Sequence, residues 1–401
     1  MRRKAHLFAY RSRFQLFFVT LFLLLSIVPL MATIISIWKQ DRIESNPIVQ
    51  WYHSVVQPVQ ELRPLITFPQ SWEGRWYDSD KNYHRFEKWF GDRLAFRDLM
   101  IRSKNELDYR LFRSSSRVYF ASGKEIYGRH LLDIELPAVE NFLTTPGNAD
   151  YVRRGMISFT QALKAEGVTV LFVTPLQKEY FWPNRLPFFA PKLDRSSQFF
   201  SLYTQLNNEP QLNVVDVVGI LDKLQVTTPT FYRQDFHWTN MSAMAVSKDI
   251  VDTIARWEGS SLSWSHPMDY SLKPYAGSDA RFSARLFARD SVFEPQLNHA
   301  WADVHEKTPM DASKTGLEFE TNAITDKGLL PSACMFGNSF SDGMLEAGIA
   351  DYFESFTKLD RTRDMSEIPA LIRGRCKYLI VQILDLQIQH WAAFQRRGLG
   401  S

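Results

Sequence analysis

Cysteine is nearly absent from this sequence, and no Cys-x-x-Cys pair occurs. With only Cys334 and Cys376, the chain cannot be a disulfide-stapled scaffold or a protein built on a cysteine-based metal site. Both residues lie before or within apolar, strand-like runs. Two interpretations stay open: a disulfide formed in an oxidising compartment, and a pair of buried free thiols.

Internal repeats, low-complexity tracts and a marked excess of one charge are lacking as well. The 401 residues are 45% hydrophobic and 23% charged, which is typical of a folded globular protein and excludes disorder as the main state. Five basic residues precede residue 14, and without them 42 basic residues stand against 44 acidic ones. Because the bulk of the chain is not a polycation, we expect no nucleic-acid partner.

Charge is missing entirely from residues 14–38. At ~1.5 Å per residue this apolar segment can span a ~30 Å hydrocarbon layer, so it predicts one transmembrane signal anchor. The basic residues of 1–13 place that tail in the cytoplasm and the rest of the chain outside, in the periplasm of a Gram-negative host, at its inner membrane. The alternatives are a cleaved signal peptide and a long buried helix of a soluble protein.

Residues 39–115 are expected to form a juxtamembrane connector followed by helices. The first part is punctuated by prolines and has no lasting periodicity, whereas the pattern from Asn82 to Arg113 is helical. Gly91 is expected to bend or divide that helical stretch.

The chain from 116 to 395 alternates strand-like and helical segments after a hairpin around Ser122-Gly123. Its strand-like runs are apolar throughout, as in strands that are buried on both faces. We therefore expect an α/β fold with a parallel sheet covered by helices on both sides. Residues 260–330 are expected to be an insertion of irregular and some β structure. The expected strands are Val168–Thr174, Asn213–Ile220, Ser332–Phe336 and Tyr378–Leu384, and the expected helices are Tyr151–Glu166, Met241–Trp257 and Asp342–Phe353.

The first candidate for chemistry is Ser339, in the segment Phe336–Ser341 between an expected strand and an expected helix. Gly337, two residues before the serine, permits a sharp turn that exposes the hydroxyl at the carboxyl edge of the sheet, near helix N-terminal amides. Those amides can stabilise an oxyanion. The alternative is ordinary turn chemistry, with Ser339 as a helix N-cap.

The second candidate is the pair Asp235 and His237, just before an amphipathic helix. Two residues apart in an extended segment, the side chains project to the same side. Asp235 can then orient the imidazole, and His237 can take a proton from a serine. A metal pair and a purely capping Asp235 are the alternatives, but no second histidine cluster supports a metal.

Together these residues supply nucleophile, base and orienter, and here the sequence resembles a known family. The order Asp-x-His first and Gly-x-Ser later is similar to the circularly permuted SGNH-hydrolase-like domain of periplasmic alginate O-acetyltransferases, the AlgJ and AlgX type. The similarity extends from about Phe86 to His390. The segments that carry it are Phe86–Arg93, Pro175–Tyr180, Tyr232–Thr239 and Gly337–Ser341.

Two positions depart from the family pattern. Asn338 stands where the family often has aspartate, although Asp235 still supplies the acid of the triad. The run Val381–Gln387 lacks the acidic residue and the arginine with which this segment ends in the family. The resemblance therefore does not identify the late part of the site or a third donor to the oxyanion.

The resemblance implies an acetyltransferase that needs no metal or other cofactor. Ser339 would carry an acetyl ester, with His237 as base and then acid, before transfer to a hydroxyl of a bacterial exopolysaccharide such as alginate. The implied partner is a membrane-bound O-acyltransferase that delivers the acetyl group. The residues expected to bind the substrate are Lys178, Tyr180, Trp182, Tyr232, Arg233, Trp238 and Asn338, with core packing as the alternative for each aromatic one.

Two other functions remain open at this point. Water can resolve the same acyl-serine, which would make the protein a carbohydrate esterase. From a different class, the alternative is a non-catalytic glycan-binding scaffold of a polysaccharide export complex; loss of Asp235, His237 or Ser339 would favour it, and all three are present.

Overall fold

The computed structural model describes residues 15–24, 27–34, 56–61, 64–68, 80–287, 292–304, 306–310, 318–323 and 328–400. The chain divides into two compact units. The first unit is Met1–Arg113 with Arg281–Ala288, and the second is Ser114–Ala280 with Arg289–Ser401. The expected tail 1–13, the last residues 35–38 of the expected anchor, and residues 39–55, 62–63 and 69–79 of the expected connector lie outside the described residues.

The first unit contains one helix, Gln15–Ile34, that is long and apolar enough to cross a membrane. An 18-residue window of this 20-residue helix has a mean hydropathy of 2.5, and at ~1.5 Å per residue the helix extends over about 30 Å. The expected helical stretch after residue 80 is divided into α3 (Asp80–Asp92) and α4 (Arg97–Phe112). The division falls just after Gly91, where Phe96 has a left-handed backbone conformation with φ 61°.

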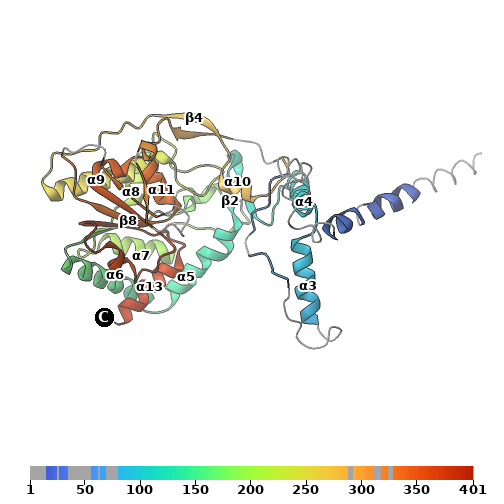
Figure 1. Cartoon of the computed structure of the whole chain (residues 1–401), viewed down its shortest axis with the longest axis horizontal. Helices are drawn as coiled ribbons and strands as arrows, with labels where there is room; N and C mark the ends of the chain where they lie inside the picture. Colours follow the sequence, from blue (N-terminus) through green and yellow to red (C-terminus); the bar gives the residue numbers. More distant parts are fainter. Residues whose placement is uncertain are drawn as a thin grey trace, which may run out of the picture. The chain divides into compact units, whose positions relative to one another are not determined.

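The second unit is built on a six-stranded mixed sheet with the strand order β3-β10-β8-β9-β7-β6 (Figure 1). The first four strands in this order are parallel, which confirms the expected parallel core. The last two pair antiparallel at one edge. The strands are β3 (Thr169–Val173), β6 (Thr308–Pro309), β7 (Phe319–Asn322), β8 (Ala333–Gly337), β9 (Ser355–Asp360) and β10 (Tyr378–Gln382).

Helices cover both faces of this sheet (Figure 1). Alternate strand residues serve alternate faces: Val170 and Phe172 pack with α5, α6, α7, α12 and α13, whereas Leu171 and Val173 pack with α8, α9 and α11. Such strands must be apolar throughout, which is why the sequence pattern reveals them. The helices are α5 (Leu136–Thr144), α6 (Asn148–Ala165), α7 (Gln198–Asn207), α8 (Val217–Leu224), α9 (Asn240–Glu258), α11 (Ser339–Glu346), α12 (Ile368–Ile372) and α13 (Ile388–Leu399).

The expected strand Asn213–Ile220 is wrong. Only Val214 pairs with the sheet, through an isolated parallel bridge to Phe172, and Val217–Leu224 is the helix α8. Asp216 explains the early helix start, because its side chain accepts a hydrogen bond from the Gly219 backbone N–H at 3.0 Å and caps the first turn. An apolar run of this length suits a buried helix as well as a buried strand.

The remaining elements lie around this core. A short hairpin, β1 (Val118–Phe120) and β2 (Ile126–Gly128), forms where the sequence predicts one. The insertion 260–330 contributes the antiparallel pair β4 (Tyr270–Tyr275) and β5 (Val292–Leu297), the short helix α10 (Ser278–Phe282), and the two antiparallel edge strands.

Cys334 in β8 and Cys376 before β10 form a disulfide, with their Cα atoms 5.7 Å apart. Of the two interpretations that the sequence leaves open, a disulfide and a pair of free thiols, the structure contains the disulfide.

Candidate functional site

Ser339 lies at the sharp turn between β8 and α11, at the carboxyl edge of the parallel strands. Asn338 caps the helix, because its Oδ1 accepts a hydrogen bond from the Phe340 backbone N–H at 2.9 Å. A Cβ atom on Gly337 would lie 2.6 Å from the Ser341 Oγ and 2.8 Å from the Gln382 Oε1, so only glycine fits here. The Ser339 side chain is exposed to solvent.

Asp235 and His237 lie in a loop that is closed by an antiparallel bridge between Phe231 and Trp238. The loop is bent rather than extended, which corrects the expected geometry. The two side chains meet because Asp235 Oδ1 accepts hydrogen bonds from both the His237 backbone N–H, at 3.1 Å, and the His237 ring Nδ1, at 2.6 Å.

The structure brings this loop and the serine turn together. His237 Nε2 lies 2.7 Å from Ser339 Oγ. An ionised carboxylate only accepts hydrogen bonds, so Nδ1 carries the ring proton toward Asp235 and Nε2 is left to accept the proton of the serine hydroxyl. Trp238 joins the same two segments, because its Nε1–H donates to the Phe340 carbonyl oxygen at 3.1 Å.

The insertion supplies further donors to the Asp235 carboxylate. The Ser278 Oγ–H donates to Oδ1 at 2.6 Å, while the Ser278 N–H and the Tyr275 hydroxyl donate to Oδ2 at 2.9 and 2.8 Å. Burial of this carboxylate acts to raise its pKa. The hydrogen bonds from His237 and Ser278 outweigh burial and hold the pKa of Asp235 well below its usual range, so the group is ionised at neutral pH.

Two buried lysines fix the backbone around the site. Lys178 Nζ donates to the carbonyl oxygens of Ile126 at 2.7 Å and of Asp235 at 3.0 Å. Lys358 Nζ, in β9, donates to the carbonyl oxygens of Gly337 at 2.7 Å and Leu359 at 3.1 Å. One lysine thus holds the acid–base loop and the other holds the turn that carries the serine.

Most of the residues expected to contact substrate are in the interior. Five of the seven have only 1–5% of their surface exposed, so these side chains offer almost no surface to a glycan. Their motif similarity reflects packing: Lys178 binds backbone carbonyls, and Tyr232 stacks on Tyr275 with ring centroids 4.6 Å apart. Only Trp182 and Arg233 are partly exposed. The five buried residues are Lys178, Tyr180, Tyr232, Trp238 and Asn338.

Sequence reasoning missed the glutamines that take the place of the expected acidic and arginine ending. Gln382 Oε1 accepts from the Asn338 backbone N–H at 2.9 Å, and Gln387 Oε1 accepts from the Asn338 side-chain amide at 3.3 Å. The Asn338 amide is therefore engaged within the protein. Ser278 and Tyr275 were also missed, since nothing in the local pattern of the insertion ties it to a residue 40 positions earlier.

Among the residues that the structure describes, no group of three or more histidine, cysteine, aspartate or glutamate side chains is arranged to hold a metal ion. The site itself presents an exposed hydroxyl, a part-exposed imidazole and a buried carboxylate in one chain of hydrogen bonds.

Several solved structures resemble this chain at low sequence identity. Among solved structures, that of Bacillus cereus PatB1 is 12% identical, with a TM-score of 0.44 over 61% of this chain and 91% of that one. The O-acetyltransferase domain of Pseudomonas putida AlgJ is 11% identical, with a TM-score of 0.43 over 70% and 99%. Pseudomonas aeruginosa AlgX is 12% identical, with a TM-score of 0.38 over 71% and 67%.

Among curated proteins, no sequence matches the chain. The model of the family described as "SGNH hydrolase-like domain, acetyltransferase AlgX" matches residues 140–346, which is more than half of the chain. The protein therefore belongs to this family of SGNH hydrolase-like acetyltransferase domains.

Proposed function

We propose that the protein is an O-acetyltransferase that moves acetyl groups through an ester on Ser339 to hydroxyls of a bacterial exopolysaccharide. The observation that carries this proposal is the chain of hydrogen bonds from Asp235 through His237 to Ser339, at 2.6 and 2.7 Å. Both distances are within the range needed for proton transfer. Family membership supports acetyl transfer as the reaction.

In the first half-reaction, Ser339 Oγ attacks the carbonyl carbon of an acetyl donor while its proton passes to His237 Nε2. Ser339 stands at the N-terminus of α11, where the helix dipole favours the negative charge of the developing oxyanion. When the tetrahedral adduct collapses, the bond to the donor breaks and His237 returns the proton to the leaving group. In the second half-reaction a sugar hydroxyl attacks the ester, His237 takes its proton, and Ser339 leaves with that proton.

Asp235 has a positioning and electrostatic role in this scheme. It fixes the tautomer of His237 and stabilises the imidazolium formed when the serine proton arrives. Its lowered pKa keeps it charged throughout the working pH range.

The decisive experiment uses the full-length protein in detergent and measures acetate released from an activated acetyl ester. Ser339→Ala and His237→Ala are expected to reduce the rate by at least about 10³-fold, and Asp235→Ala by less. Ser201→Ala changes a serine on the surface of α7 and serves as the matched control. An acetyl adduct on the Ser339 peptide is expected by mass spectrometry. Wild-type rates from the Ser339→Ala protein would refute the nucleophile.

Adding polysaccharide fragments separates the proposal from its rival. The exposure of Ser339 lets water reach an ester there, which favours a carbohydrate esterase as the second candidate. A transferase diverts acetyl groups from water to sugar hydroxyls, whereas an esterase yields acetate with every glycan. A protein that binds glycan without any acyl chemistry would be a scaffold.

We also propose that the helix Gln15–Ile34 anchors the protein in the bacterial inner membrane, with the second unit in the periplasm. Its length and apolar character support this placement, and a membrane-bound O-acyltransferase is the acetyl donor that the placement suits. Of two reporters fused after residue 60, the one that is active only after export is expected to work, and the one that is active only in the cytoplasm is expected to fail. Activity of a cytoplasmic reporter there would contradict the topology.

A further inference from the structure

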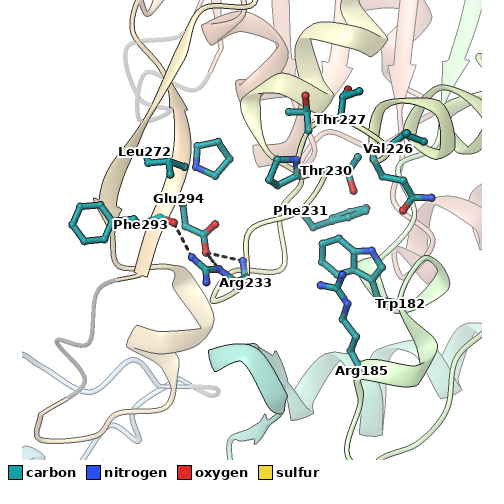
Figure 2. A pocket seen from close by; sticks show the side chains of 14 residues that line it. Trp182, Arg185, Val226, Thr227, Thr230, Phe231, Arg233, Leu272, Phe293 and Glu294 are labelled. Atoms are coloured by element: carbon teal, nitrogen blue, oxygen red, sulfur yellow. Dashed lines mark hydrogen bonds and ion pairs between the residues drawn. The ribbon is translucent and has the colours of Figure 1, made fainter.

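A cavity of about 730 Å³ lies in the second unit, beside the segment that leads to Asp235. Its volume is that of a site for a small molecule or a few units of a polymer. Figure 2 shows two facing walls: the hairpin of β4 and β5 contributes Leu272 and Phe293, and the opposite side contributes Trp182, Phe231 and Val226. Neither Ser339 nor His237 lines this cavity.

The cavity is lined by apolar side chains and by hydroxyl groups, the two kinds of group that a sugar ring also presents. Trp182 is partly exposed and packs edge-to-face on Phe231, which is buried behind it, with ring centroids 5.4 Å apart. Leu272, on the hairpin across the cavity, adds an exposed apolar side chain, whereas the ring of Phe293 points away from the cavity (Figure 2). Thr227 adds a hydroxyl in the same lining. A pyranose presents apolar C–H faces to such walls and hydroxyls at its edges, so the chemistry is complementary.

The charges of the cavity are already neutralised within the protein. Arg233 donates to Glu294 Oε1 through its backbone N–H at 3.1 Å and through Nε at 3.0 Å (Figure 2). Arg185, whose guanidinium lies 4.0 Å from the Trp182 ring centroid, is paired with Glu125. Because each arginine has a buried carboxylate partner, the lining offers polar contacts to hydroxyls and no net positive charge to attract a carboxylate.

The cavity is near the acyl-transfer residues along the chain. Arg233 lines it, and His237 follows four residues later, so their Cα atoms lie at most about 14 Å apart. The bridge between Phe231 and Trp238 makes the same loop contribute to both places. The cavity and the acid–base loop are therefore built from the same short segment of the chain.

We propose that this cavity binds a neutral, hydroxyl-rich stretch of the glycan and presents a neighbouring sugar to the acetyl-serine. The inference rests on the proposed function for its biological meaning, but binding itself does not require acyl transfer. It selects uncharged glycans, such as glucose-based polymers, over polyuronates.

The test measures glycan binding by calorimetry with the full-length Ser339→Ala protein in a sugar-free detergent. Short β-glucan oligosaccharides are expected to bind at least about 10-fold more tightly than oligouronates of the same length. Adding Trp182→Ala should weaken β-glucan binding by about 10-fold or more. Trp257→Ala, at another part-exposed tryptophan outside this cavity, is the matched control and should leave binding unchanged.

Three outcomes would overturn the inference: equal or tighter binding of oligouronates, no β-glucan binding at millimolar concentration, or unchanged binding after Trp182→Ala. The far-UV circular dichroism spectrum of the Ser339→Ala protein that also carries Trp182→Ala should match that of the Ser339→Ala protein, which shows that the fold is intact. If the cavity binds glycan as expected but the wild-type protein never acetylates it, the proposed function fails and the binding site stands.

Discussion

Gly277 provides a sensitive test of how Asp235 is positioned. A Cβ atom at this glycine would lie 2.0 Å from the Gln234 carbonyl oxygen and 2.9 Å from the Asp235 Cβ. Since Cβ atoms essentially never approach another atom within 3.0 Å, the backbone before Asp235 must move by at least 1.0 Å in a Gly277→Ala protein. We predict a fall in kcat of about 10²-fold, because a shift of this size breaks the aligned hydrogen bonds through His237. The overpacking should also cost about 1–3 kcal/mol of unfolding free energy.

Acetate release from an activated ester, with kcat and KM determined separately, is the assay. Gly91→Ala is the first control, because nothing lies within 4 Å of the added methyl group. Gly398→Ala is the second: its Cβ would lie 1.8 Å from the Tyr151 carbonyl oxygen, a similar clash between α13 and α6. It should lower stability while sparing kcat in the folded fraction. The reasoning is refuted if the Gly277→Ala protein keeps a wild-type kcat, or if the kcat of the Gly398→Ala protein falls by as much as that of Gly277→Ala.

Two further predictions concern stability. Burial lowers the pKa of Lys358 from 10.5 to about 8, although Asp342 and other carboxylates act to raise it. Between pH 8 and pH 10.5 the unfolded chain therefore binds more protons than the folded protein. The unfolding free energy of the wild type relative to Lys358→Met should therefore rise by up to about 3 kcal/mol from pH 8 to 10.5 in urea titrations; a flat difference would contradict the burial of a charged lysine. The disulfide closes a loop between residues 42 apart, so replacing Cys334 and Cys376 by alanine should cost about 4 kcal/mol in the same titrations, and an unchanged midpoint would argue against the bridge.

The sheet core could be predicted because its strands are buried on both faces and therefore apolar at every position. The strands β3, β8 and β10 were found in this way. The strand β9 was missed because Thr357 and Lys358 interrupt its apolar pattern, and the need for a buried lysine arises only from the Gly337 carbonyl on a neighbouring strand. The periodic pattern of apolar residues indicates whether a side chain is buried, but it does not indicate which distant group that side chain contacts.

The three residues of the candidate site could be predicted, but their supporting residues could not. Asp235, His237 and Ser339 lie in segments whose turn and loop residues can be recognised in the sequence. Ser278 belongs to an insertion without such a pattern, and its bonds to Asp235 depend on a close backbone approach at Gly277. The buried aromatic residues were misinterpreted for a related reason, since the sequence alone does not tell which face of a loop meets solvent.

The strand order has a consequence for the synthesis of the protein. The strand β10 lies between β3 and β8, yet it is the last of the described strands to be made. Until it inserts, β3 and the helices around it have no hydrogen-bonded connection to the rest of the sheet. A chain that ends before β10 is therefore expected to lack every ladder hydrogen bond that joins β3 to β8, so its sheet stays in two separate parts.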